Sequence, residues 1–193
     1  MAPSPSPEDV ELLLDIADEA IERALAGQRA KPPALASLPP SLREPVGVFV
    51  TLRVGGELNG CIGALDGVEP LGPAVARLAV SAAFGDPRLP ALRPADRPHL
   101  TIEISLLSPL EPIAVANRDE LLASLRPGTD GLVVVALGRR ALFLPAVWEQ
   151  LPDPERFVDQ LWAKAGLSPG TWPKGIELSR FTARHHEREA VGL

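Results

Sequence analysis

A single cysteine, Cys61, is the residue in this sequence with the most direct capacity for chemistry. It stands between glycines in the segment Gly60-Cys61-Ile62-Gly63. A thiolate is a nucleophile and a redox group, and flanking glycines would let a ligand or another backbone approach the sulfur closely. By residue type alone, a free cysteine is more often a small buried hydrophobe, and glycines in a strand often mark a bulge. Both interpretations stay open at this point.

Cys61 is predicted to lie in the second strand of a hairpin. Residues 46–54 are rich in β-branched side chains, 55–57 are typical of a turn, and 58–65 return as a second strand. Because side chains alternate along a strand, a one-residue change of register moves every side chain to the opposite face of the sheet. The length of the turn therefore decides whether the thiol faces the core or a polar surface.

Two registers are compatible with the turn residues. A two-residue turn would pair Cys61 with Val50 on the apolar face, whereas a three-residue loop would pair it with Thr51. We prefer the longer loop, because it keeps the apolar residues of both strands on one face. Asn59 would then lie opposite Arg53. That register gathers four polar side chains of the hairpin on one surface: Thr51, Arg53, Asn59 and Cys61.

A third strand-like segment, 99–107, offers acid–base partners for the thiol. Its apolar residues alternate with polar ones that include His99 and Glu103. A nucleophilic thiol needs a base or a cation nearby, and these two side chains are the best candidates. Each also has a plainer explanation, because a mid-strand glutamate is often solvated and a histidine after a proline can simply begin a strand. We expect Cys61 and Glu103 to be catalytic, and we expect five residues to bind substrate: Thr51, Arg53, Asn59, Gly60 and His99.

Other site chemistries have weaker support in the sequence. His185 and His186 lie near Glu187 and Glu189, but adjacent histidines in a polar segment are usually solvated, and no established zinc-ligand spacing accompanies them. The glycine pairs follow no strand-to-helix junction, so they do not resemble a phosphate-binding loop. We therefore expect neither a metal nor a cofactor.

Composition narrows the class of protein. Of 193 residues, 46% are hydrophobic and 23% are charged, which is typical of a globular domain. The net charge is −6 and the 19 basic residues are scattered, which argues against a nucleic acid or an anionic membrane as the main partner. One cysteine cannot form an internal disulfide, and neither a secretory leader nor a membrane-spanning run is recognisable. The sequence predicts a cytoplasmic protein.

The order of predicted elements favours an α+β fold. Helical spacing predicts helices over 7–26, 70–84, about 119–125 and 153–166, and further strands are expected at 132–137, 141–144 and 176–182. Hairpins interspersed with helices favour a central, mainly antiparallel sheet flanked by helices. We expect a single domain over 7–183, with flexible termini at 1–6 and 184–193.

Several segments resemble the AMMECR domain family, named from a chromosomal region linked to Alport syndrome, midface hypoplasia and elliptocytosis. The hallmark of that family is a Leu-Arg-Gly-Cys-Ile-Gly segment in a hairpin, to which 58–63 is similar. Further segments are similar in the same order: Phe49-Val50-Thr51-Leu52, Ala82-Ala83-Phe84-Gly85-Asp86-Pro87-Arg88, 102–108, Asp130-Gly131-Leu132, Leu144-Pro145 and Lys164-Ala165-Gly166-Leu167. The resemblance covers residues 8–182.

The resemblance implies an α+β fold with a smaller subdomain and a functional cleft near the cysteine hairpin. The family has no firmly assigned reaction. Its members often occur fused to, or encoded beside, a Memo-type protein and a radical S-adenosylmethionine enzyme, which implies such partners by association. Two classes of function follow for this chain. One is thiol-dependent chemistry, and the other is a non-catalytic adaptor or a module that binds a small molecule or a peptide.

The sequence departs from the family pattern at two positions. Asn59 replaces the arginine before Gly-Cys, and Ala146 replaces a glutamine after Leu-Pro. If the family arginine binds an anion, Arg53 is the residue expected to supply that charge here from the opposite strand.

Overall fold

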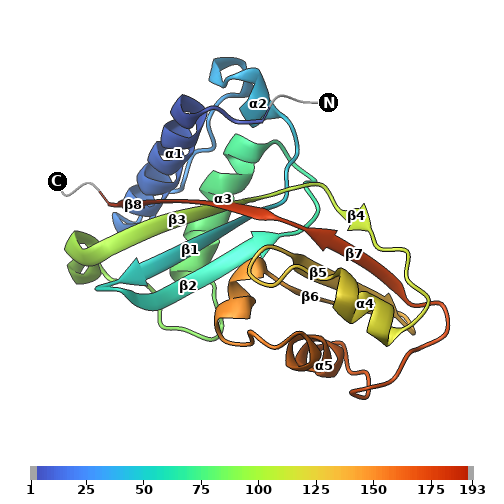
Figure 1. The fold of residues 1–193 in the computed structure, drawn as a ribbon. Helices are drawn as coiled ribbons and strands as arrows, with labels where there is room; N and C mark the ends of the chain where they lie inside the picture. Colours follow the sequence, from blue (N-terminus) through green and yellow to red (C-terminus); the bar gives the residue numbers. More distant parts are fainter. Residues whose placement is uncertain (1–3, 191–193) are drawn as a thin grey trace. The chain divides into compact units, whose positions relative to one another are not determined.

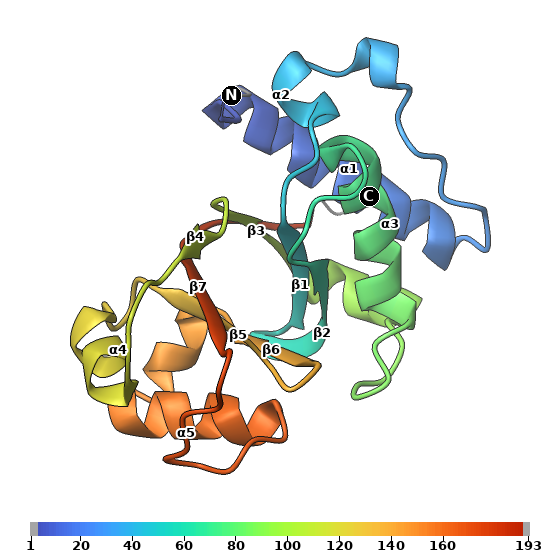
Figure 2. The ribbon, with the colours of Figure 1, turned by 90° about the vertical axis from the view of Figure 1, so that its right-hand side faces the viewer.

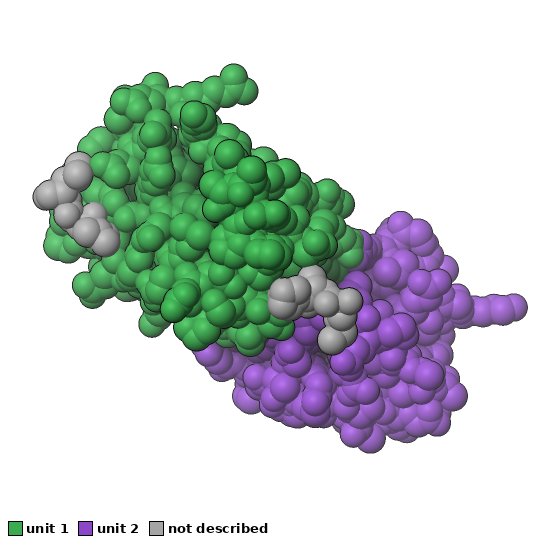
Figure 3. Space-filling model, turned by 90° about the horizontal axis from the view of Figure 1, so that it is seen from above, with its two compact units in different colours: residues 1–107, 184–193 green, residues 108–183 purple. Residues whose placement is uncertain are grey.

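The computed structural model describes residues 4–190 and divides into two compact units. Unit 1 contains the chain up to Leu107 together with the segment from Arg184, and unit 2 contains Ser108–Ala183 (Figure 3). Each unit has its own sheet and its own core, which matches the smaller subdomain that the resemblance implied. The single domain expected over 7–183 stays a prediction. The expected flexible ends at 1–3 and 191–193 lie outside the described residues.

Two long helices cover one face of the sheet of unit 1 (Figures 1 and 2). Helix α1, Pro7–Leu25, begins with a capping box in which Ser6 and Asp9 bond to each other's backbone N–H groups. Helix α3, Leu71–Phe84, is apolar on most of its surface. Shorter helical turns connect these elements: η1 (Leu35–Ser37), α2 (Pro40–Arg43) and η2 (Pro94–His99).

The sheet of unit 1 has the order β2-β1-β3-β8. Its strands are β1 (Val48–Val54), β2 (Glu57–Ala64), β3 (Leu100–Leu107) and β8 (Ala183–Glu189). Alternate residues such as Val50, Leu52 and Ile104 are fully buried in one core with residues of α1 and α3. The side chains between them face away from the helices, and this opposite face carries the candidate site.

Two sequence predictions about these strands are wrong. The expected polar tail from 184 is instead strand β8 as far as Glu189. His99 is not a strand residue, because it ends η2 and β3 begins at Leu100. A polar segment can form this strand because β8 lies at the edge of the sheet, where most of its charged and polar side chains remain exposed.

Unit 2 is built around a second antiparallel sheet with the order β4-β7-β5-β6. Its elements are β4 (Glu111–Pro112), α4 (Arg118–Ser124), β5 (Gly131–Ala136), β6 (Arg139–Phe143), η3 (Pro145–Glu149), α5 (Pro154–Lys164) and β7 (Glu177–Phe181). Phe157 and Trp162 of α5 are fully buried, and Trp148 stacks on Phe157 with ring centroids 3.8 Å apart. The predicted α+β class with antiparallel sheets is confirmed.

Candidate functional site

The hairpin that carries Cys61 combines features of both predicted registers. Its turn has two residues, Gly55 and Gly56, with φ of 57° and 88°, values that favour glycine and a tight primed turn. Between Leu52 and Arg53 the register shifts by one, which is a β-bulge. The extra residue restores the register preferred from the apolar pattern, so the predicted pairing of Cys61 with Thr51 is confirmed.

The bulge overturns the predicted pairing of Asn59 with Arg53. Arg53 lies opposite Leu58, and Asn59 is the extra residue of the bulge without a cross-strand partner. The Arg53 guanidinium instead donates to the carbonyl of Gly56 at 3.4 Å. Arg53 therefore does not replace the family arginine at the position of Asn59.

The glycines beside Cys61 are explained by packing. A Cβ atom at Gly60 would overlap the carbonyl of Ala82 in α3, and one at Gly63 would overlap the ring of Phe49. Gly60 thus faces the helix layer rather than the polar face, and its expected role in binding substrate stays a prediction. The flanking glycines are required for close packing, and they do not by themselves indicate a reactive thiol.

The backbone of Cys61 is held by an ion pair from the segment after α3. Its N–H donates to Oδ2 of Asp86 at 3.0 Å, and its carbonyl accepts from Nη2 of Arg88 at 3.0 Å. Arg88 also donates to both carboxylate oxygens of Asp86, at 2.9 and 2.7 Å. Because β2 is an edge strand, these outward-facing backbone groups would otherwise lack protein partners. The Asp86–Arg88 pair therefore fixes the peptide that carries the thiol.

The Asp86–Arg88 pair is charged at neutral pH. Hydrogen bonds from Arg88, followed by those from the N–H groups of Cys61 and Arg88, hold the pKa of Asp86 well below its usual range, although burial opposes them. The pKa of Arg88 is raised, first by its bond to Asp86 and further by the charge that Cys61 would carry as a thiolate. The charges of the two side chains therefore balance each other, and the pair acts on Cys61 through its backbone groups.

Cys61 belongs to a row of polar side chains on the face turned away from the helices. The Thr51 hydroxyl donates to Sγ of Cys61 at 3.4 Å, and Thr51 in turn lies opposite Glu103 on β3. Cys61 is half-buried, and Thr51 is 8% exposed. Three neighbouring strands therefore place a thiol, a hydroxyl and a carboxylate side by side, as the pairing of Cys61 with Thr51 predicted.

Strand β8 extends this row with a histidine that sequence reasoning left in the tail. Nδ1 of His185 lies 3.1 Å from Oε1 of Glu103 and 2.9 Å from Oγ of Ser105, and Ser105 donates to Glu103 at 3.0 Å. A histidine that donates its Nδ1–H to a carboxylate keeps the lone pair of Nε2 available as a base. His99, the predicted partner, is exposed at the turn end of the hairpin, where its carbonyl accepts from Gly55.

Comparison with known proteins identifies the family. The AMMECR1 family model matches residues 14–186. This chain belongs to the AMMECR1 family. A protein of Thermofilum pendens is 37% identical over 192 residues, which cover 93% of this chain and 89% of the relative. One of Methanothermobacter thermautotrophicus is 40% identical over 159 residues, which cover 81% and 82%.

A solved structure shows the same fold for an AMMECR1-type chain. The crystal structure of the uncharacterized protein PH0010 from Pyrococcus horikoshii matches with a TM-score of 0.84 and 34% sequence identity. The match covers 96% of this chain and 94% of that chain. The resemblance to the family that was drawn from the cysteine hairpin is thereby confirmed.

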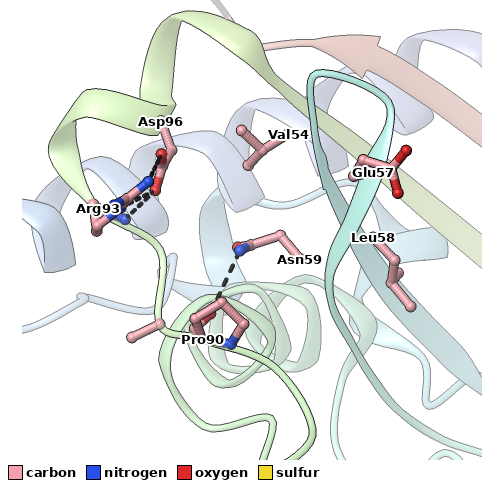
Figure 4. A pocket seen from close by; sticks show the side chains of 8 residues that line it. Val54, Glu57, Leu58, Asn59, Pro90, Arg93 and Asp96 are labelled. Carbon is pink, nitrogen blue, oxygen red and sulfur yellow. Dashed lines mark hydrogen bonds and ion pairs between the residues drawn. The ribbon is translucent and has the colours of Figure 1, made fainter.

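This AMMECR1-family chain also has a pocket of about 310 Å³ beside the bulge, which we call the bulge pocket (Figure 4). The hairpin contributes Val54, Glu57, Leu58 and Asn59 to its lining, and the segment after Arg88 contributes Pro90, Ala91, Arg93 and Asp96. The two walls continue the segments that hold Cys61. The pocket and the thiol are therefore built on the same pair of segments in unit 1.

Among residues 4–190, no group of three or more histidine, cysteine, aspartate or glutamate side chains is placed to hold a metal ion. In the same part of the chain, no helix has the length and apolar character needed to cross a membrane.

Sequence reasoning did not assign Asp86 and Arg88 to the site. Their segment contributed to the family resemblance and was otherwise interpreted as the end of a helix. A signal was present, since an aspartate directly after an apolar helix and before Pro87 is a charged group at the edge of a core. Its partner Cys61 lies 25 residues earlier, so only the fold reveals the contact.

Proposed function

We propose that this AMMECR1-family protein performs thiol-dependent chemistry, with Cys61 as the nucleophile toward a small molecule or a peptide. The observation that carries the proposal is the Asp86–Arg88 pair, which binds both backbone polar groups of Cys61. Holding a reacting group in one geometry lowers the entropic part of a reaction barrier. The carboxylate of Asp86 is buried, and burying a charge is costly unless it is paired and hydrogen-bonded, as it is here by Arg88 and two backbone N–H groups.

One side chain contacts the sulfur directly. The Thr51 hydroxyl donates to Sγ at 3.4 Å. Hydrogen bonds and cations that act on the charged form of an acid stabilise that form. In the proposed step, Sγ loses its proton to solvent and adds to a carbonyl carbon of the substrate; the π electron pair of the C=O bond moves to the oxygen, which takes up a proton from solvent.

Glu103 and His185 are proposed to act on a different part of the same substrate. Three strand spacings of about 4.8 Å separate β2 from β8, so His185 lies roughly 14 Å across the sheet from Cys61. That separation is too large for direct proton transfer between them. With Nδ1 oriented by Glu103, Nε2 of His185 can accept a proton from a substrate that extends along the row.

The rate of Cys61 alkylation by iodoacetamide as a function of pH tests this proposal. Because the protein has one cysteine, the labelled mass reports on this thiol alone. We expect fast labelling at neutral pH, above the rate of a free cysteine in a short peptide. Labelling that is slow at every pH in the folded protein, and becomes fast only in denaturant, would contradict a nucleophilic role.

A second candidate function is non-catalytic binding of a small molecule or a peptide. The bulge pocket favours it, because its volume lies at the lower end of the range of ligand sites. In this alternative the Asp86–Arg88 pair serves only to protect an edge strand. Unchanged binding of a ligand to a Cys61→Ser variant, together with an unreactive thiol, would favour this alternative.

A Memo-type protein or a radical S-adenosylmethionine enzyme is the proposed partner, and the cytoplasm is the proposed location. The partner is supported by the family's gene association alone. A location that keeps thiols reduced is consistent with a single cysteine used for chemistry. Co-purification of tagged protein with products of neighbouring genes tests the partner, with a Cys61→Ser variant showing whether the thiol takes part.

A further inference from the structure

The bulge pocket has a charge pattern that selects among ligands. Arg93 donates to Asp96 through its backbone N–H, Nε and Nη2, at 2.8–3.0 Å, so the two side chains form a neutral pair. At the rim, Glu57 is exposed and has neither a hydrogen-bond nor an ion-pair partner among the described residues. The formal charge of the lining is therefore −1. An anion would meet a guanidinium that is already neutralised, whereas a cation would meet an unpaired carboxylate.

Asn59 contributes a hydrogen-bond acceptor without a partner to the bulge pocket. Oδ1 of Asn59 is shielded from water and receives no hydrogen bond. Its Nδ2 is held only by a long bond of 3.4 Å to the carbonyl of Pro90. The tip of Asn59 points into the space between Pro90, Arg93 and Val54 (Figure 4). The terminal torsion of asparagine is soft, so a small rotation presents Oδ1 to a ligand that carries N–H groups.

The remaining lining of the bulge pocket is apolar. Val54, Leu58 and Ala91, with the ring of Pro90, offer contact for a short aliphatic chain. We propose that the pocket binds an ammonium or guanidinium group on such a chain, and that it anchors the substrate of Cys61. The second part rests on the proposed function. The anchor and the thiol are two residues apart on β2, at Asn59 and Cys61.

Binding is tested with three probes of matched size on the full chain: n-butylammonium, n-butylguanidinium and butyrate. Shifts of backbone amide signals in ¹H–¹⁵N spectra report the contact. We expect the two cations, and not butyrate, to shift the signals of Asn59, Ala91 and Arg93 in a saturable manner. Equal shifts with butyrate, or shifts confined to other parts of the chain, would overturn the assignment of a cation pocket.

Three variants sharpen the result. Asn59→Asp adds a carboxylate of the same shape and should tighten cation binding by about fivefold to tenfold. Asn59→Arg fills the pocket with a cation and should abolish binding. Glu57→Gln should weaken it about twofold to threefold, the small effect of an exposed charge. Binding that Asn59→Arg leaves intact would show that the cations bind elsewhere.

The source of the cationic group is resolved by comparing agmatine with a blocked tetrapeptide that contains one arginine. Tighter binding of agmatine indicates a free metabolite, and tighter binding of the peptide indicates a protein side chain. Either result supports the shared chemistry, and failure of both contradicts it.

Failure of the anchor and failure of the thiol proposal give different results. Cys61→Ser should bind n-butylguanidinium as the unmodified chain does, since the sulfur is outside the pocket lining. A saturating cation should change the rate of Cys61 alkylation by about twofold or more, because both sites share β2. Cation binding with an unchanged alkylation rate would remove the anchoring role. If Cys61 is not alkylated in the folded protein but cation binding is intact, only the proposal of thiol-dependent chemistry is contradicted.

Discussion

Each unit of this protein contains a buried aspartate paired with an exposed arginine. In unit 1 the side chain of Asp86 is 1% exposed and that of Arg88 is 64% exposed, and in unit 2 Asp130 and Arg126 have values of 0% and 55%. The shortest N–O distances are 2.7 and 2.6 Å. In both pairs the carboxylate also accepts a hydrogen bond from a backbone N–H. The two ion pairs are therefore similar in burial, distance and hydrogen bonding.

The two pairs differ in what they hold. Asp130 accepts from the N–H of Arg126 four residues earlier, and its own carbonyl accepts from the indole of Trp148, so it organises the turn before β5 and the core behind it. Asp86 likewise accepts from the N–H of Arg88 within its own turn, but it also accepts from the N–H of Cys61, 25 residues earlier in another element. A buried ion pair therefore does not mark function by itself. Its importance here follows from the peptide that it positions.

Replacing either aspartate by alanine should give the largest loss of stability among the variants that test this comparison. Asp86→Ala and Asp130→Ala should each lower the free energy of unfolding by about 2–4 kcal/mol, because each strands backbone donors inside the fold. Urea unfolding measures both losses. Only Asp86→Ala should change the alkylation rate of Cys61 in the folded protein. An equal change of the alkylation rate in the Asp130→Ala variant would contradict a specific role of the Asp86–Arg88 pair in positioning Cys61.

Glycine positions in the two sheets offer a second contrast. Gly60→Ala should destabilise the protein by about 3 kcal/mol, since the added methyl group meets the backbone of α3. Gly131→Ala should cost less, about 2 kcal/mol, because the added methyl group meets the ring of Phe181, a side chain, and no backbone atom. Thermal unfolding of both variants gives the ranking, and a reversed order would argue against tight packing of β2 on α3.

The dependence of folding stability on pH in the acid range should show that Asp86 is ionised in the folded protein. Its pKa is lowered in the folded protein, chiefly by Arg88, so its stabilising contribution is complete above the unfolded pKa and is lost as the pH falls toward the folded pKa. From about pH 4 to about pH 2, the unmodified chain should lose about 1–2 kcal/mol more stability than Asp86→Asn, which cannot titrate. Denaturant midpoints across this range provide the measurement. Parallel acid profiles would mean that Asp86 does not carry the charge described.

The smallest expected effect concerns Thr51. Thr51→Val removes the hydroxyl that donates to Sγ while keeping the side-chain shape, and it should slow Cys61 alkylation at neutral pH about twofold to threefold. Stability should change by less than about 1 kcal/mol. Thr101→Val, on the same face and without a contact to the sulfur, is the matched control. A comparable slowing in the control would point to a general effect on β1 and β3.

Local patterns were sufficient to predict the helices, most strands and the facing of Cys61. The apolar alternation of two strands determined the pairing with Thr51, since only one register buries both sets. The bulge could not be predicted, because the turn residues and the apolar pattern each satisfied a different register. Inserting Asn59 reconciles them, and no single local rule contains that solution.

The parts of the site that were missed depend on contacts distant in sequence. His185 was assigned to a tail because β8 lacks apolar alternation, which an edge strand does not need. Asp86 and Arg88 were recognised only as part of a family segment and as a helix end. Their roles follow from contact with Cys61, which depends on how α3 packs against β2.

The interrupted course of unit 1 has a consequence for how the chain is made. Strand β8 completes the first sheet, yet it follows all of unit 2 in sequence. On the ribosome, unit 2 can therefore finish folding while the edge of β3 is still open. The edge of β3 has no strand partner until residues 183–189 have been synthesised. Synthesis of β8 therefore completes both the four-stranded sheet and the row of polar side chains that contains His185.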